Sequence, residues 1–459
     1  MEEININLIK KYNVDGPYYS SYPVLSEWSN SFSNTDYLSG LNELCAKDNT
    51  PIFLYIHFPF CIKQCYYCIC NSIITYNHSV TKKYLNHISK EIDLLFNFFE
   101  KHSYTPNIKM IHLGGGSPNL MNNIEFNFLI EKIKSLTDIN NLYEFAIEID
   151  PRTVNKEKIA YYASKGINRL SFGIQDFDPY VQKAINRIQP SIMIEKLLSP
   201  EIRKLFKSVN FDILYGLPLQ TKESFNKTIE TVIKLSPDRI TLIKYAHLPK
   251  KIRHQRLINE DALPSYVDGQ QMFIEAINNL TSNGYEHVGI DHFGKSTDEM
   301  IKAKINNTLW RNFGGVSPGG THNIIGIGPT STSSVNNFYI QNVYSLSEYY
   351  DSIDKNKFPV LRGYKLDTDD LIRRKIINEI ICYGFLKFNE IEKLFDINFN
   401  NYFETELNML NGLITDGFIL FDTKSLTVTS LGRIFIRHIC KIFDKKYSKK
   451  ENIYRISGP

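Results

Sequence analysis

The feature that most constrains the fold is an alternation of short β-rich runs with amphipathic helical stretches between about residues 50 and 293. Helical stretches such as KKYLNHISKEIDLLFNFF carry apolar residues at three- and four-residue spacing. Repeated strand–helix units predict a parallel sheet with helices outside it. The expected strands are IFLYIHF (52–58), MIHL (110–113), EFAIEID (144–150), RLSFGI (169–174), VNFDILY (209–215), RITLIKY (239–245) and EHVGIDHF (286–293).

Six or so such units predict an α/β fold with a closed or partial (β/α)6-type barrel over residues 49–293. A doubly wound open sheet is the competing architecture, because periodicity alone does not exclude it. An N-terminal arm is expected at residues 1–48. Residues 294–364 are expected to form a barrel extension with active-site loops, and GGVSPGGTHNIIGIGPTS within them is expected to be one long loop.

Residues 365–459 predict a smaller C-terminal helical domain that covers the active site. Helices are expected near 367–383 and 400–413, followed by a hairpin of FILF and LTV and a helix from Leu431. Helices with a small β wing resemble a winged-helix domain. DNA binding is not expected, since no concentrated basic recognition face accompanies the pattern apart from the Lys-rich tail at 445–450.

Three cysteines in HFPFCIKQCYYCICN, at C-x3-C-x2-C spacing, indicate a metal centre: Cys61, Cys65 and Cys68. Three thiolates hold three irons of a [4Fe-4S] cluster and leave the fourth iron open, whereas ferredoxin-type sites use four. S-adenosylmethionine (SAM) can chelate such an iron, so the loop predicts radical SAM chemistry. The alternative is a structural zinc site with Cys70 as fourth ligand, although zinc ligands usually form two separated pairs.

Composition limits the class of protein and its partners. The chain has 459 residues and a net charge of +4, which is too small to indicate nucleic acid as the principal partner. No signal peptide and no run of apolar residues long enough to span a membrane is apparent. Seven cysteines form too sparse and odd a set for a disulfide framework. A cytoplasmic protein is expected.

Further polar groups follow successive expected strands, where parallel α/β folds build their sites. HLGGGSPN (112–119) is a glycine-rich turn that lacks the lysine of a P-loop, and it allows close backbone approach to a ligand. Glu148 lies in AIEIDP, Gln175 in GIQDF, Arg187 in NRIQ and Asp212 in DILYGLP. Their common placement predicts a shared ligand site at one barrel mouth.

These motifs closely resemble those of the oxygen-independent coproporphyrinogen III oxidases, a branch of the radical SAM superfamily. The resemblance runs through KYNVDGPYYSSYP, LYIHFPFCIKQCYYCICN, HLGGGSPNL, IEIDPRTV, LSFGIQDFDPYVQKAINRIQ, ILYGLPLQTKESF, YAHLP, GIDHF and WRNF to TSLGRIFIRHICKIFD. It covers nearly the whole chain. The CxC that ends the cluster loop separates this branch from haem-chaperone relatives.

The resemblance implies oxidative decarboxylation of two propionates of coproporphyrinogen III to vinyl groups, giving protoporphyrinogen IX in anaerobic haem biosynthesis. It implies a tetrapyrrole substrate, a low-potential electron donor, a monomer and two SAM molecules beside the cluster. The first SAM would contact Tyr55, Gly115, Glu148 and Ala246. The second would contact Tyr67, Gly116, Ser117, Gln175, Arg187 and Asp212, and Thr332 would line an adenosine.

The chain departs from the family pattern at several of these motifs. The family's RNFQGYTTQG reads RNFGGVSPGG here, so Gly314 stands in place of a glutamine; Tyr18, Ile69 and Thr332 also replace family residues. A glutamine restored at 314 is expected to raise SAM occupancy of the second site. Two alternatives stay open: a paralogue acting on another tetrapyrrole, and a haem-binding or trafficking protein that uses His57, His112, His247 or His292.

Overall fold

The centre of the computed structural model, which describes residues 5–47, 49–447 and 455–457, is a twelve-stranded sheet. Its order is β10-β11-β9-β8-β7-β6-β5-β2-β14-β15-β16-β17. Seven neighbouring strands are parallel: β9 (Arg239–Lys244), β8 (Ser208–Tyr215), β7 (Arg169–Gln175), β6 (Glu144–Ile149), β5 (Asn107–Gly115), β2 (Pro51–Phe58) and β14 (Asn323–Ile327).

The strand order decides between the two architectures expected from the sequence. Strands β2 and β5 to β9 pair in the order in which the chain makes them, without the reversal that defines a doubly wound sheet. Among the described residues the edge strands β10 and β17 do not pair with each other. The prediction of a partial barrel is confirmed, and the doubly wound alternative is wrong.

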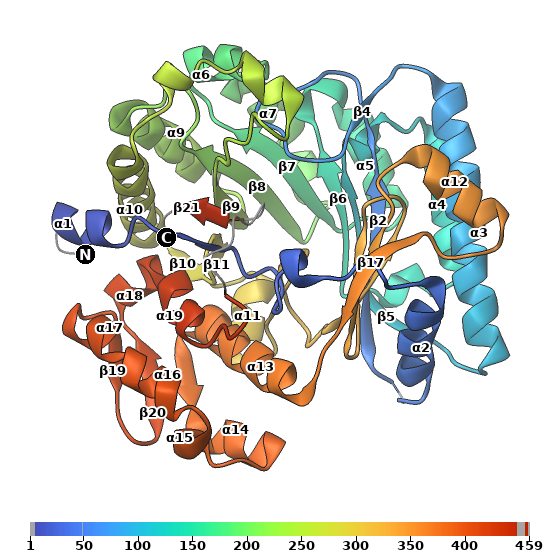
Figure 1. Cartoon of the computed structure of the whole chain (residues 1–459). Coiled ribbons are helices and arrows are strands. Elements are labelled where there is room, and N and C mark those ends of the chain that lie inside the picture. Colours follow the sequence, from blue (N-terminus) through green and yellow to red (C-terminus); the bar gives the residue numbers. More distant parts are fainter. Residues whose placement is uncertain (1–4, 48, 448–454, 458–459) are drawn as a thin grey trace.

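Helices pack on the outer side of this partial barrel (Figure 1). Their ends follow local signals: Asn77 caps α3 by accepting from the N–H of Ser79, and Asn122 with Glu125 forms a capping box on α4. The helices are α3 (His78–Lys101), α4 (Asn123–Lys134), α5 (Lys156–Ser164), α6 (Pro179–Ala184), α7 (Ser191–Leu197), α8 (Pro200–Arg203), α9 (Lys222–Leu235) and α10 (Tyr266–Ser282).

The seventh expected strand, 286–293, is not one strand. It forms an antiparallel hairpin of β10 (Tyr285–Val288) and β11 (His292–Lys295), and β11 pairs antiparallel with β9. Gly289 lies in the turn with a φ of +66°, a conformation that glycine adopts at little cost. This residue reverses the chain inside an apolar run whose composition predicts a continuous strand.

Residues 294–364 contain more regular structure than expected. The prediction of one long loop over GGVSPGGTHNIIGIGPTS is wrong, because it contains β13 and the fully buried β14. β14 adds to the parallel sheet beside β2. The remaining elements here are α11 (Glu299–Ile305), β12 (Trp310–Asn312), β13 (Gly315–Ser317), β15 (Thr332–Val335), β16 (Phe338–Asn342), α12 (Leu346–Asp354) and β17 (Val360–Lys365).

The C-terminal part begins with α13 (Thr368–Tyr383), as expected. The prediction of helix near 400–413 is confirmed in position, but the chain forms three short helices there that break at Phe403 and Leu410. The hairpin is confirmed, and it gains a third strand in the order β18-β20-β19. The elements are β18 (Phe385–Lys387), α14 (Phe388–Phe395), α15 (Phe399–Tyr402), α16 (Glu404–Met409), α17 (Asn411–Thr415), β19 (Ile419–Phe421), β20 (Ser425–Val428), α18 (Ser430–Ile434) and α19 (Ile436–Ile442).

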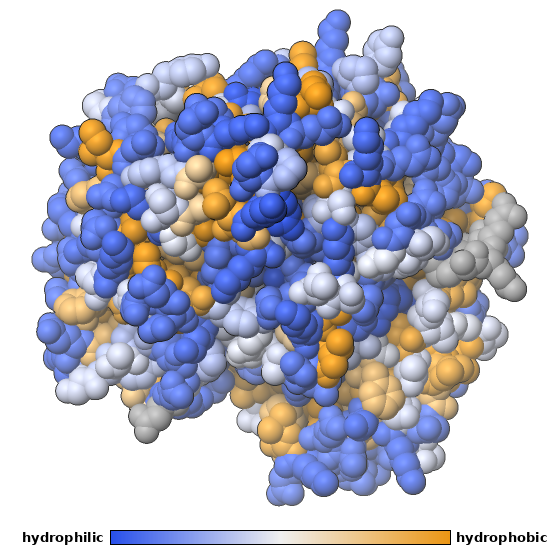
Figure 2. Space-filling model, turned by 180° about the vertical axis from the view of Figure 1, so that it is seen from behind, coloured by the Kyte–Doolittle hydropathy of each residue, from blue (hydrophilic) through white to orange (hydrophobic). Residues whose placement is uncertain are grey.

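The N-terminal arm pairs with a strand near the C-terminus of the chain. It holds α1 (Ile6–Lys11), β1 (Asp15–Pro17) and α2 (Asn34–Cys45), and β1 pairs antiparallel with β21 (Arg455–Ser457). The face shown in Figure 2 is mainly hydrophilic, with apolar residues in small scattered groups. In the part of the chain that the structure describes, no helix is both long and apolar enough to cross a membrane.

Candidate cluster and cofactor site

The cysteine loop is anchored at both ends to the carboxyl edge of the parallel sheet. It leaves β2 through β3 (Phe60–Cys61) and returns through β4 (Ile73–Ile74), which pairs parallel with β3. In its middle the N–H of Tyr66 donates to the carbonyl of Ile185, at 3.0 Å. The cysteines therefore lie on a loop held by backbone hydrogen bonds from two directions.

The glycine-rich turn after β5 packs directly against this loop. The N–H of Gly116 donates to the carbonyl of Phe58 at 2.7 Å, and the N–H of Ser117 donates to that of Phe60 at 2.8 Å. A Cβ at Gly116 would lie 2.7 Å from the carbonyl oxygen of Phe60, so only glycine allows this approach. The hydroxyl of Ser117 reaches the sulfur of Cys61, at 3.5 Å.

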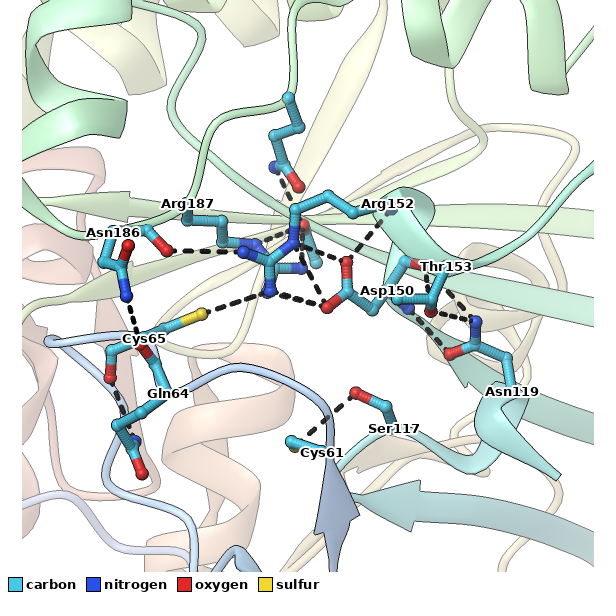
Figure 3. Close-up of polar contacts among 12 residues, drawn as sticks. Cys61, Gln64, Cys65, Ser117, Asn119, Asp150, Arg152, Thr153, Asn186 and Arg187 are labelled. Carbon is cyan, nitrogen blue, oxygen red and sulfur yellow. Dashed lines mark hydrogen bonds and ion pairs between the residues drawn. The ribbon is translucent and has the colours of Figure 1, made fainter. Parts of the chain in front are cut away.

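Two guanidinium groups face the second cysteine (Figure 3). Nη2 of Arg152 lies 3.4 Å and Nη1 of Arg187 lies 3.5 Å from Sγ of Cys65. Asp150 pairs with Arg152 at 2.6 Å and with Arg187 at 3.6 Å. Burial of Asp150 is outweighed by the charges of Arg187 and Arg152, which lower its pKa to about 2. A fixed positive field therefore surrounds a sulfur that must be a thiolate to bind metal.

The third cysteine is supported by its neighbour and by a distant segment. The backbone N–H of Cys70 donates to Sγ of Cys68 at 3.4 Å, and hydrogen bonding from Cys70 lowers the pKa of the Cys68 thiol. Nε2 of His254 lies 2.6 Å from the carbonyl of Cys68. Gln255, fully buried, donates to the carbonyl of Tyr67 at 3.0 Å. Residues 254–255 therefore hold the loop by further hydrogen bonds, in addition to the one from Tyr66 to Ile185.

The zinc alternative finds no ligand set. Within the described ranges, no three His, Cys, Asp or Glu side chains gather closely enough to hold a single metal ion. In a [4Fe-4S] cluster each cysteine binds a different iron, so the thiolates stand apart around a larger body. Cys61, Cys65 and Cys68 lie on one loop that backbone hydrogen bonds hold in place, which suits ligands of a single cluster.

Glu148 on β6 lies beside the glycine-rich turn and keeps about a third of its side chain exposed (35%). It accepts hydrogen bonds from the N–H of Gly115 at 2.9 Å and from Nε2 of His112 at 3.0 Å. Burial alone would raise the pKa of Glu148, but these bonds outweigh it and lower the pKa. The carboxylate therefore stays ionised and can face a cationic ligand.

Tyr55 completes this first group. A Cβ built at Gly114 would lie 2.6 Å from Oε1 of Glu148 and 2.9 Å from Cε2 of Tyr55, so all three line one narrow space. Tyr55 also stacks near His112, with ring centroids 5.9 Å apart. The structure thus brings Tyr55, Gly115 and Glu148 together, as the sequence predicts.

A second group gathers at Gly173, in the middle of the neighbouring strand β7. Nη2 of Arg187 donates to the Gly173 carbonyl at 2.7 Å, and a Cβ at Gly173 would lie 2.9 Å from Nε2 of Gln175. Asp212 lies beside Gly173 in the backbone register of the parallel strands β7 and β8. Oδ2 of Asp212 accepts from Ser171 at 3.1 Å. Burial raises the pKa of Asp212.

Tyr67 belongs to the same region, because it packs against the apolar group that includes Val181 and Ile185, just before Arg187. Ala246 and Thr332 are placed less directly. Ala246 follows β9, and its carbonyl accepts from Gln255 at 3.0 Å. Thr332 lies on β15, where its carbonyl approaches Gly326 of β14, the residue paired with Tyr55. Among the described residues, neither has a hydrogen bond to another expected cofactor ligand.

The four histidines considered as haem ligands all have hydrogen-bonding partners in the structure. His57 bonds the hydroxyl of Tyr55 at 3.1 Å, and His112 bonds Glu148. His247 lies 2.8 Å from the hydroxyl of Tyr245, and His292 lies 2.5 Å from Asp291. These contacts give each ring a structural role.

Several functional neighbours were not assigned to the cluster or cofactor site from the sequence. Arg152, His254 and Gln255 contact the cysteine loop, and His112 supports Glu148. Arg152 and His112 stand inside motifs already singled out, IEIDPRTV and HLGGGSPN, and could have been found there. His254 and Gln255 carry no such signal, because only the folded chain brings them to residues 67–68.

Comparison with known proteins agrees with this geometry. A family model for the radical SAM superfamily matches residues 55–232. Oxygen-independent coproporphyrinogen III oxidases from Synechocystis and Escherichia coli are 37% and 36% identical over 452 and 453 residues. These alignments cover 98% and 99% of this chain and 96% and 98% of the relatives.

A solved structure supports the same assignment along the whole chain. Coproporphyrinogen III oxidase from Escherichia coli, described as a radical SAM enzyme, superposes with a TM-score of 0.90 and 35% identity. The match covers 97% of this chain and 99% of that one. The superfamily binds a [4Fe-4S] cluster and SAM, which the three-cysteine loop and ionised Glu148 suit. The chain therefore belongs to the oxygen-independent coproporphyrinogen III oxidase family of the radical SAM superfamily.

Proposed function

We propose that this protein oxidatively decarboxylates two propionate side chains of coproporphyrinogen III to vinyl groups. The observation that carries the proposal is the geometry of the cysteine loop. Cys61 and Cys65 are held against the glycine-rich turn and the arginine pair, at the carboxyl ends of parallel strands. When bound, the cluster and SAM together supply the 5′-deoxyadenosyl radical that removes a hydrogen atom from a propionate. The residues of the chain provide binding, orientation and charge.

Glu148 has the clearest task in this proposal. Its carboxylate is oriented by His112 and by the Gly115 N–H, and it is ionised near neutral pH. A fixed carboxylate is suited to hold the positively charged part of one SAM molecule, with Tyr55 beside it. Because His112 donates to Oε1 and Gly115 to Oε2, both oxygens are oriented before a ligand arrives.

A second SAM molecule is the finer part of the proposal. The group around Gly173 supplies a guanidinium, an amide and a carboxylate from Arg187, Gln175 and Asp212. Arg187 already shares its charge with Asp150 and Cys65, which links this group to the cluster loop. Ser117 on the glycine-rich turn donates a hydrogen bond to the sulfur of Cys61, so this turn is also linked to the cysteine loop.

The test is an anaerobic assay of the reconstituted protein with coproporphyrinogen III, SAM and dithionite. Protoporphyrinogen IX and about two equivalents of 5′-deoxyadenosine per product are expected, one for each vinyl group formed. A Cys61→Ala variant is the matched negative control. SAM cleavage without any vinyl product would refute the assignment of the substrate and favour a paralogue that acts on another tetrapyrrole.

A further inference from the structure

Three surface segments meet around the cysteine loop and form one continuous face. They are residues 61–77, 179–192 and 245–259. Nδ2 of Asn186 donates to the carbonyl of Gln64 at 2.8 Å, which joins the second segment to the first. His254, 2.6 Å from the carbonyl of Cys68, joins the third. We call these three segments the cysteine-loop face.

This face carries positive charge without internal compensation. None of its three segments contains Asp or Glu, and six of its cations are exposed: Lys63, Lys183, Lys250, Lys251, Arg253 and Arg256. No ion pair joins any of them to an acid in the described part of the chain. Some exposed lysines elsewhere do pair, for example Lys90 with Asp354 at 2.6 Å and Lys227 with Glu223 at 2.8 Å.

Two acids at the border of the face, Glu260 and Asp178, have other partners. Glu260 lies 3.1 Å from Nε2 of His247. Asp178 caps α6 by accepting from the N–H groups of Tyr180 and Val181. Asp261 follows Glu260 and lies just outside the third segment. A cluster of unpaired cations costs free energy through mutual repulsion, so its presence favours an anionic partner.

Exposed apolar side chains stand among these cations. Ile69 and Ile188 are 61% exposed, and Leu257 is 63% exposed. Ile69 directly follows Cys68, and Leu257 lies two residues beyond Gln255, which bonds to Tyr67. A few apolar groups within a charged rim suit a small, short-lived protein complex rather than a permanent interface.

We propose that the cysteine-loop face docks an acidic one-electron carrier protein of the flavodoxin type, which reduces the cluster. The proposal rests on the proposed function, since SAM cleavage consumes one electron. In the complex the carrier loses one electron and the cluster gains it, and no proton or group is transferred. The segments that bear the cations are hydrogen-bonded to residues 64–68, so the carrier would sit next to the cluster ligands.

The primary test measures binding rather than turnover. Affinity for an oxidised flavodoxin is measured calorimetrically for the wild type and for Lys63→Glu/Lys183→Glu/Arg253→Glu, at about 50 mM and 300 mM salt. The control is Lys101→Glu/Lys207→Glu/Lys234→Glu. Its three exposed lysines lie at the ends of α3 and α9 and just before β8, at the opposite end of the barrel.

Charge reversal on the face should weaken binding at least about tenfold at low salt, and the control should stay within about twofold of the wild type. The wild-type affinity should fall steeply with salt, and that of the face variant should change little. Because folding could confound a triple variant, the matching Lys→Gln and Arg→Gln triple should show an intermediate loss. Equal, salt-independent binding by all variants would overturn the proposal.

Turnover separates this proposal from the proposed function. With dithionite as reductant, the face variant should cleave SAM and form product as the wild type does, and only flavodoxin-driven turnover should fall. Loss of dithionite-driven product with normal flavodoxin binding would show that the cations serve substrate carboxylates, which overturns docking. A wild type that binds flavodoxin and cleaves SAM but makes no vinyl product would instead refute the substrate.

Discussion

The family pattern has glutamine where this chain has Gly314. Introducing that glutamine alone is expected to destabilise the folded protein. Gly314 lies in the turn between β12 and β13, and Asn312 accepts its N–H at 2.9 Å. A Cβ built there would lie 2.7 Å from Cε1 of Phe53, a buried residue of β2. Phe53 thus fills the space that a side chain at 314 would need.

The size of the loss in the free energy of unfolding follows from the contact between position 314 and Phe53. No real Cβ tolerates 2.7 Å to a ring carbon, and Phe53 is only 4% exposed, so the ring has little room to move. Overpacking of this kind costs about 1–3 kcal/mol for Gly314→Gln. Phe53→Ala alone opens a cavity and costs about 3–5 kcal/mol. In the double variant the glutamine fills part of the cavity, so the total cost should fall short of the sum by about 1–2 kcal/mol.

The assay is a double-mutant cycle on the free energy of unfolding in urea, with SAM stoichiometry measured anaerobically for the same four proteins. Gly314→Gln by itself is therefore not expected to raise SAM occupancy of the second site. Only the double variant gives the glutamine side chain room. Strict additivity of the two free-energy changes would refute the packing argument. A stable Gly314→Gln variant with raised SAM occupancy would do the same.

The other predictions concern the cluster, the cofactor and a buried acid. Cys65→Ala should lose the cluster, and Cys70→Ala should keep about four irons per chain by metal analysis; zinc in place of iron in the wild type, with loss of the metal from Cys70→Ala as well, would support the zinc alternative. Glu148→Gln removes an ionised group at constant volume, so SAM should bind more weakly with an unchanged cluster spectrum; wild-type affinity would make Glu148 structural. Glu91, 2% exposed, accepts from Gly328 N–H at 2.8 Å and Tyr349 at 2.7 Å, yet burial raises its pKa to about 7. The pKa of Glu91 in the folded protein exceeds its unfolded value of 4.5. Its contribution to the free energy of unfolding is therefore greatest below about pH 4.5. Its contribution falls by about 3 kcal/mol as pH rises to about 7. Glu91→Gln should remove that fall in urea titrations at successive pH values, and parallel curves for both proteins would contradict this origin.

Elements whose signals are local could be predicted from the amino-acid sequence. The helix and strand periods predict six of the parallel strands and the helices between them, because side-chain spacing along one segment decides which face is buried. Asn77, Asn122 and Asp367 mark helix starts in the same local way. The three cysteines are also local, since their spacing places them on one loop before any packing occurs.

Other features depend on residues far apart along the chain. Asn323–Ile327 lies in a stretch rich in glycine and proline, yet it becomes a strand because the open edge of β2 offers it hydrogen-bonding partners. Gly289 permits the turn between β10 and β11, but the place of that hairpin in the sheet depends on the antiparallel pairing of β11 with β9, which no pattern within residues 285–295 specifies. Strand propensity is too dependent on such partners to be decided by composition.

In the candidate site, too, some features could be predicted from sequence motifs and others are seen only in the folded chain. Motif placement at strand ends predicted that Glu148, Gln175 and Asp212 would share one barrel mouth, and this required only the alternation of strands and helices. The arginine pair on Cys65, the brace from His254 and Gln255, and the collision of position 314 with Phe53 came only from the tertiary structure. Each is a contact between segments separated by tens to hundreds of residues. Such contacts are set by how the packed elements meet, and no segment encodes them alone.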